Sequence, residues 1–111
     1  MTNEEKLESV KAFLNENKLK FFTNFVSRRT GRHPEVYVPL HRIMVKISEG
    51  TEKDTEFFKA VRFKYHPLFI RETETEEFVL EKMKNLIVDC MTKGHRIHQK
   101  YYDKKQNKKA K

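Results

Sequence analysis

Three charged residues that could assist phosphate chemistry lie close together in this chain. Glu35 precedes a stretch of alternating apolar residues, and Lys46 and Glu49 lie near its other end. Water attack on a phosphodiester needs charge neutralisation and a lowered pKa of the attacking water, which a divalent metal held by carboxylates supplies. These three residue types suit such chemistry, and the alternative is that they are solvated loop charges and a lysine at the end of a strand.

Other kinds of catalytic or metal site have weaker support. His95 and His98 are three residues apart and Cys90 is a turn away, but zinc would need at least a third well-placed ligand. The sequence shows no Ser/His/Asp spacing, phosphate loop or dinucleotide fingerprint, and its three glycines leave little material for one. Cys90 falls on an apolar helical stripe, where a cysteine is usually a small core residue. The leading interpretation therefore includes no catalytic residue, metal or cofactor.

The strongest functional signal is positive charge at the C-terminal end. Residues 93–111 contain eight Lys or Arg and one acid, Asp103, which gives a net charge of +7. Residues 1–92 carry 16 basic and 15 acidic residues, so most of the formal net charge of +8 belongs to this tail. A block of like charge repels itself and attracts polyanions. The partner to expect is nucleic acid, either DNA or RNA.

A second basic element lies in the first half of the chain. Residues 28–34 combine three arginines and a histidine with Gly31 and Pro34, a composition typical of an exposed loop. Arginine suits bidentate contact with phosphate, and tyrosines near the tail could stack on unpaired bases. The residues that we expect to contact nucleic acid are Arg28, Arg29, Arg32, Lys93, Arg96, Lys100, Tyr101, Lys104, Lys105, Lys108 and Lys109.

The periodicity of apolar residues predicts the order of elements. Residues 3–17, 51–66 and 73–91 show helical spacing, with capping patterns that begin at Thr2, Thr51 and Thr73. Residues 19–26 have a period of two that predicts a strand buried on much of both faces. Residues 36–40, 43–47 and 67–71 predict three more strands. Because Pro39 cannot donate to a ladder, its strand lies at an edge or bends there.

This order predicts an α+β fold. The expected elements are a helix, a three-stranded meander, a helix, a strand and a long C-terminal helix, in a mixed sheet flanked by helices. Short loops favour antiparallel pairing among the first three strands, whereas a crossover helix favours parallel addition of the fourth. Residues 1–92 are expected to form a single globular domain, and residues 93–111 a basic helical extension with a disordered tail.

Residues 34–86 resemble the core of PD-(D/E)xK nucleases, in particular small endonucleases of the very-short-patch-repair type. The segments that carry the resemblance are Pro34-Glu35-Val36-Tyr37-Val38-Pro39 before a hydrophobic strand, Gly50 after it, residues 54–62 on the crossover helix, and Phe69-Ile70-Arg71. The resemblance implies a restriction-endonuclease-like fold and a metal held by an acid near the second strand and an acid-x-Lys motif on the third. If Lys46 is the family's lysine, Met44 replaces that second acid, which makes the site degenerate. The catalytic residues that the resemblance implies are then Glu35, Glu49 and Lys46, with Mg²⁺ as the cofactor of a nuclease.

Cysteine content and hydropathy indicate the environment. The single cysteine excludes an internal disulfide and suits a reducing compartment. The sequence has no secretory signal and no apolar run near the roughly 18 residues that span a bilayer, so we expect a cytoplasmic protein.

The sequence as a whole predicts a small non-catalytic protein that binds nucleic acid with little sequence specificity. It would contact phosphates through the basic tail and the arginine-rich loop. Two alternatives stay open. One is a metal-dependent nuclease with a degenerate site, and the other is a structural or protein-interaction subunit with a solubilising tail.

Overall fold

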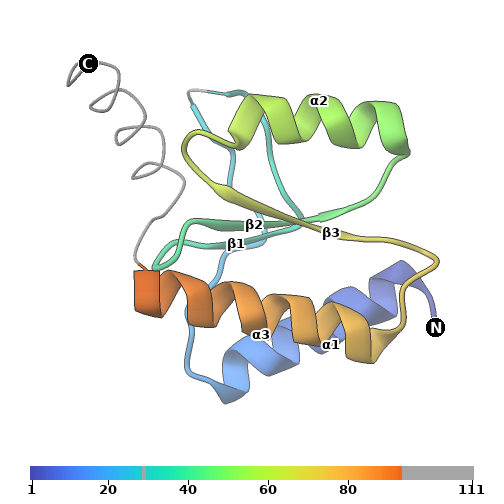
Figure 1. Ribbon diagram of the computed structural model, residues 1–111, viewed down its shortest axis with the longest axis vertical. Helices are drawn as coiled ribbons and strands as arrows, with labels where there is room; N and C mark the ends of the chain where they lie inside the picture. Colours follow the sequence, from blue (N-terminus) through green and yellow to red (C-terminus); the bar gives the residue numbers. More distant parts are fainter. Residues whose placement is uncertain (29, 94–111) are drawn as a thin grey trace, which may run out of the picture.

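A mixed three-stranded sheet lies at the centre of the protein, with helices on both of its faces (Figure 1). This computed structural model describes residues 1–28 and 30–93. The elements in chain order are α1 (Asn3–Glu16), β1 (Val36–Val38), β2 (Ile43–Ile47), α2 (Thr51–Val61), β3 (His66–Ile70) and α3 (Glu76–Lys93). The predicted α+β class and the order of helix, strands, helix, strand and C-terminal helix are confirmed.

The sheet combines both modes of strand pairing. β1 and β2 are antiparallel, with Val36 opposite Val45, and β2 and β3 are parallel, with Val45 opposite Leu68. A parallel pair needs a long crossover connection, and α2 supplies it. In Figure 1, α2 covers one face of the sheet, and α1 and α3 lie together on the other.

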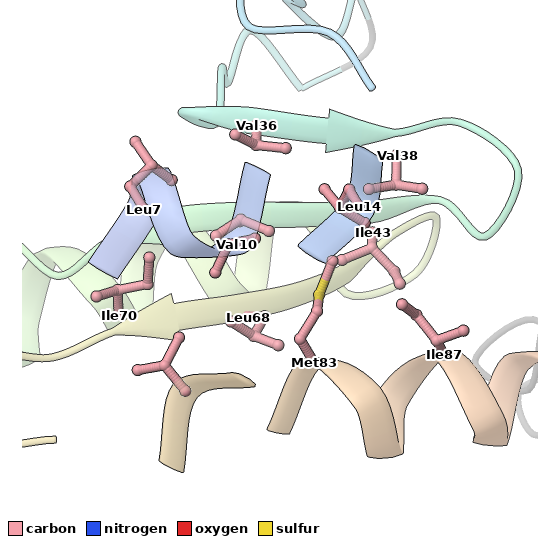
Figure 2. Packing of buried hydrophobic residues seen from close by; sticks show 12 residues of the cluster. Leu7, Val10, Leu14, Val36, Val38, Ile43, Leu68, Ile70, Met83 and Ile87 are labelled. Atoms are coloured by element: carbon pink, nitrogen blue, oxygen red, sulfur yellow. The ribbon is translucent and has the colours of Figure 1, made fainter. Parts of the chain in front are cut away.

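Alternation along the strands divides the buried side chains between these two faces. The larger cluster joins the sheet to α1 and α3 (Figure 2), and it consists of Leu7, Val10, Leu14, Val36, Val38, Ile43, Val45, Leu68, Ile70, Val79, Met83 and Ile87. The smaller cluster, under α2, consists of Met44, Phe57, Val61 and Phe69. Because side chains on a strand alternate, Lys46 shares the α2 face with Met44.

The first helix begins as predicted. Thr2 and Glu5 form a capping box at α1, in which each side chain accepts the other residue's N–H at 3.1 Å. These two bonds satisfy N–H groups that would otherwise lack partners at the start of the helix.

The starts of the other two helices differ from the prediction. Gly50, not Thr51, is the cap of α2, because Thr51 already has helical geometry. The third helix begins at Glu76 rather than at Thr73, and the Thr75 hydroxyl accepts the N–H of Phe78. The delay has a local cause: a turn occupies residues 71–74, where the Glu74 carboxylate accepts the Arg71 N–H at 3.1 Å.

Residues 19–26 do not form the predicted strand. They pair with β1 at one bridge, where Phe22 and Tyr37 exchange two hydrogen bonds of 2.8 Å. Toward residue 20 the next partner would be Pro39, which has no N–H to donate, and toward residue 24 it would be Glu35, whose N–H already donates to the Val45 carbonyl at 2.9 Å. The expected burial on both faces is also wrong, since Phe22 and Val26 are 41% and 56% exposed. The prediction for Pro39 is confirmed, because the chain turns there toward β2.

All three helices begin at the same end of the molecule, toward which β2 and β3 run (Figure 1). At that end, the Lys6 ammonium of α1 donates to the Arg71 carbonyl, just after β3, at 2.9 Å. At the opposite end, the Cys90 thiol of α3 lies 3.9 Å from the His41 carbonyl. Within the residues that the structure describes, no helix has the length and apolar character needed to cross a membrane.

Candidate nucleic-acid interface

Glu35, Lys46 and Glu49 form one charged cluster at an end of the β1–β2 pair. The Lys46 Nζ lies 3.1 Å from Glu35 Oε1 and 3.7 Å from Glu49 Oε1. The other oxygen of Glu35 accepts the Ile47 N–H at 2.7 Å. The Lys46 side chain is 11% exposed, whereas those of Glu35 and Glu49 are 27% and 53% exposed. The three residues named from the sequence are therefore in contact.

Strand register brings two members of this charged cluster together. Because Val36 lies opposite Val45 in an antiparallel pair, the residue before β1 faces the residue after Val45. Those residues are Glu35 and Lys46. The Phe57 ring of α2 lies beneath the lysine, with its centroid 5.9 Å from Nζ.

A tight turn after β2 brings Glu49, the third member of the charged cluster, back toward Lys46. The Asp54 carboxylate accepts the Ser48 hydroxyl and, at 3.0 Å, the Glu49 N–H, which closes the turn before α2. Gly50 has a φ of 118°, a conformation that costs glycine little and other residues much. This turn places the Glu49 carboxylate on the same side as Lys46.

A cleft of about 320 Å³ opens beside the charged cluster. Its walls are the Arg-rich loop, defined here as residues 28–33, and the first half of α2. The residues that line it are Gly31, Arg32, His33, Lys46, Glu49, Lys53, Asp54, Glu56 and Phe57. The lining includes both cationic and anionic side chains, so the cleft offers groups for a phosphate and for a cation.

The Arg-rich loop is fixed at its two ends. The Ser27 N–H donates to the Arg32 carbonyl at 2.9 Å, and the Gly31 N–H donates to the Ser27 carbonyl at 2.8 Å. The Tyr65 hydroxyl donates to Ser27 Oγ at 3.2 Å, which ties the loop to the chain after α2. Arg28 is exposed and Arg32 is half-buried in the cleft wall.

The charged cluster is not a ready metal site. The two glutamates approach one point, but the Lys46 ammonium occupies that point. The Asp54 carboxylate, also in the cleft, is engaged by hydrogen bonds from Ser48 and Glu49. Over residues 1–28 and 30–93, no group of three or more His, Cys, Asp or Glu is placed to hold a metal ion. Mg²⁺ would fit between Glu35 and Glu49 only if Lys46 moved away.

The second candidate metal site in the sequence combined Cys90 with His95 and His98, and of these the structure describes Cys90. Its side chain is buried, and burial, followed by the nearby Asp89 carboxylate, raises the pKa of the thiol. A raised pKa disfavours the thiolate that binds metals or attacks electrophiles. His95 and His98 lie outside the described residues.

The tertiary structure assembles a basic surface that the sequence analysis missed. Between residues 17 and 48 the only acid is Glu35, and residues 57–71 contain none. The two stretches meet where Tyr65 bonds to Ser27 and where the His66 N–H donates to the Arg42 carbonyl at 2.8 Å. We use the name basic surface for the exposed and half-buried cations that neighbour this junction along the chain, which are Lys20, Arg28, Arg42, Arg62 and Lys64. The absence of acids from both stretches was the sequence signal that could have found it.

Acidic residues gather where the helices begin. The first turns of the three helices contain Glu4 and Glu5, Glu52 and Asp54, and Glu76 and Glu77. Negative side chains at these positions interact favourably with the positive ends of the helix dipoles. Residues 1–92 are nearly neutral in sum, and part of their acidic charge is concentrated in these first turns.

The contacts predicted for the tail fall mostly outside the described part of the chain. Lys93 is the last residue of α3. The expected contacts that lie outside the described residues are Arg29, Arg96, Lys100, Tyr101, Lys104, Lys105, Lys108 and Lys109.

Comparison with known proteins adds no family to this description. Neither a protein-family model, nor a curated protein, nor a solved structure matches the chain. The functional argument therefore rests on the charges and the geometry of the chain itself.

Proposed function

We propose that this chain is a small nucleic-acid-binding protein that contacts phosphates with little sequence preference and without catalysis. The basic surface carries the proposal: its five Lys and Arg residues come from stretches in which Glu35 is the only acid. Lysine and arginine contacts to phosphate supply affinity but no base recognition. DNA and RNA are both possible ligands, since each presents the same phosphates.

The position of the C-terminal tail supports the same proposal. Helix α3 finishes near the turn between β1 and β2, where Cys90 lies against His41 and the basic surface includes Arg42 (Figure 1). The chain therefore continues into residues 94–111 from the same end of the molecule. The tail and the basic surface can act on one polyanion, and the acidic helix starts lie at the far end.

Charge reversal within the basic surface tests this proposal. In Arg28→Glu and Arg62→Glu variants of the full chain, affinity for duplex DNA and RNA should fall, because each variant places a repelling carboxylate at an exposed position. The slope of log affinity against log salt should become shallower by about one for each phosphate that the variant no longer binds. Fluorescence anisotropy of a labelled oligonucleotide at several salt concentrations measures both quantities.

Arg71→Glu is the matched control for these reversals. Arg71 is exposed and undergoes the same change in net charge, but it lies beside Lys6 at the end of the molecule where the helices begin, away from the basic surface. Equal losses of affinity in all three variants would mean that only net charge matters. A protein-interaction subunit with a solubilising tail would show no salt-sensitive binding in any of them.

A metal-dependent nuclease is a second candidate function. It is favoured by the contact of Lys46 with Glu35 and Glu49 beside a cleft that also contains Arg32. Antiparallel β1 and β2, a crossover helix and parallel β3 also occur in the order that the resemblance to PD-(D/E)xK nucleases implies. The ammonium between the glutamates weighs against a resident metal, so this candidate stands second.

Cleavage of supercoiled plasmid decides between the two functions. The full chain is incubated with plasmid and Mg²⁺ or Mn²⁺, beside its Glu35→Ala variant. Metal-dependent nicking that the variant lacks would establish the nuclease. Binding without nicking by either protein would leave the non-catalytic function in place.

A further inference from the structure

Aromatic rings occupy the sheet face inside the basic surface. The Phe25 and Tyr37 rings stack with centroids 3.9 Å apart, and Tyr65 packs edge-on against both at 6.1 and 5.7 Å. Because Phe22 lies directly opposite Tyr37 in the bridge, its ring extends from the same face of the sheet. We refer to these four residues as the aromatic platform.

The aromatic platform is accessible at its outer edge. Phe22 is 41% exposed, and the other three rings are partly exposed. Helix α2 packs over β2 and β3 through Phe57 and Val61, and Phe25, Tyr37 and Tyr65 pack against the edge of this cluster, whereas Phe22 does not belong to it. The described part of the chain therefore leaves the Phe22 side of the platform open to a ligand.

Cationic residues lie near these rings. The Lys20 Nζ lies 5.3 Å from the centroid of the Phe22 ring. Arg42 is close enough to Tyr37 to act on its pKa, which burial and Tyr65 nevertheless raise above the ordinary value. Arg28 immediately follows Ser27 in the chain, and Lys64 immediately precedes Tyr65; Ser27 and Tyr65 are joined by a hydrogen bond. An accessible ring with cations on several sides is complementary to a flat, apolar group joined to phosphates.

We propose that the aromatic platform binds single-stranded nucleic acid, with a base stacked on Phe22 and the adjoining phosphates on Lys20, Arg28 and Arg42. This inference rests on the proposed nucleic-acid function and names its substrate class. Bases in a duplex are already stacked and paired, so they cannot meet a ring on a protein surface, whereas unpaired bases can. Stacking tolerates every base, which agrees with binding that has little sequence preference.

Phe78 offers a matched control for Phe22. It is 50% exposed, and the Lys82 Nζ lies 5.4 Å from the centroid of its ring. It differs in location, because it lies on α3 among Glu76, Glu77 and Glu81. If an exposed phenylalanine beside a lysine were sufficient for stacking, a base would stack equally well on Phe22 and on Phe78.

A tryptophan introduced at either position reports stacking directly, since the chain contains no tryptophan of its own. Full-length Phe22→Trp and Phe78→Trp proteins are titrated with oligo(dT), with oligo(U) and with a duplex, each about 20 nucleotides long to exceed one site. We expect quenching of the Phe22→Trp emission by both single strands, little quenching by the duplex, and none in Phe78→Trp.

Phe22→Leu tests the energetic contribution while keeping an apolar side chain. Its affinity for single strands should fall about tenfold, and its affinity for duplex should change little, with Phe78→Leu unaffected for both. Circular dichroism melting confirms that each variant is folded. Unchanged single-strand affinity in folded Phe22→Leu, with binding intact in the parent chain, would overturn the inference but leave the proposed function standing. Failure of the parent chain to bind any oligonucleotide would overturn both.

Discussion

Lys46 is a cation on a strand that is otherwise apolar, and its burial depends on carboxylates from both sides. Its ammonium meets Glu35 from the antiparallel neighbour and Glu49 from the turn that follows β2. Taking a lysine out of water is costly unless partners compensate. The charged cluster therefore stabilises the join between β1, β2 and α2, whatever its role toward a ligand.

We expect Lys46→Met to destabilise the fold by about 1–3 kcal/mol, because the partly buried Glu35 carboxylate loses its cation. This is below the value for a fully buried pair, since Glu35 and Glu49 keep contact with solvent. Urea unfolding of the full chain measures the change in the free energy of unfolding.

Glu35→Gln, made alone and together with Lys46→Met, completes a double-mutant cycle for the Lys46–Glu35 ion pair. The amide keeps the volume of Glu35 and can still accept the Ile47 N–H. A coupling energy between the two substitutions of less than about 0.3 kcal/mol would show that the contact with Lys46 contributes nothing measurable.

At the scale of elements, β3 is an edge strand whose outer side is closed by side chains. The Ile70 carbonyl accepts a hydrogen bond from the chain after β2, so the carbonyls on either side of it point away from the sheet. Lys82 of α3 donates to the Phe69 carbonyl at 2.8 Å, and Lys6 of α1 donates to the Arg71 carbonyl. These two lysines link α3 and α1 to β3. They also occupy two outward-facing carbonyls with which a strand of another chain could otherwise pair.

Lys6→Met should lower the free energy of unfolding by about 1–3 kcal/mol. Lys6 is 2% exposed, and the substitution removes the donor to the Glu72 carbonyl and one of the two donors to the Arg71 carbonyl, which keeps the Glu74 N–H. Lys11→Met is the control, because Lys11 makes one surface contact with Glu8, of a kind that contributes little. Equal effects of the two substitutions in urea unfolding would contradict a specific role for Lys6.

At the scale of the whole molecule, the acids of the helix first turns share one end. The three helices begin there (Figure 1), whereas Arg42 of the basic surface follows His41, which contacts Cys90 near the end of α3. The carboxylates of the helix starts are therefore separated from Arg42 by the length of the helices, which favours approach of a polyanion at the Arg42 end.

Removing the tail should weaken nucleic-acid binding without abolishing it. If the eight cations of residues 93–111 all met phosphates, they would contribute about −7 to the slope of log affinity against log salt, and the five of the basic surface about −4.5. A chain that ends at Thr92 should therefore keep a shallower but measurable slope. Salt titrations of the two chains test this. An unchanged slope would remove the tail from the interface, and complete loss of binding would remove the basic surface.

Periodicity was a good guide to most of this fold and a poor one to its boundaries. The helices and the three strands of the sheet follow the spacing of apolar residues, because that spacing sets which side of an element can be buried. Residues 19–26 have the same period as a strand but form one bridge. Pairing also needs a partner with free donors, and the next donor is missing on one side of the bridge, at Pro39, and already used on the other, at Glu35.

The sequence by itself determined the order of elements, the mixed sheet and the presence of basic segments, because these depend on local pattern and composition. It named Glu35, Lys46 and Glu49, but only strand register and the turn at Gly50 decided that they touch. It held no sign that Lys46 would occupy the point between the two carboxylates. The basic surface and its aromatic platform likewise depend on contacts such as Tyr65 with Ser27, which are 38 residues apart. Charges and rings act through distance in space, and only the tertiary structure sets that distance.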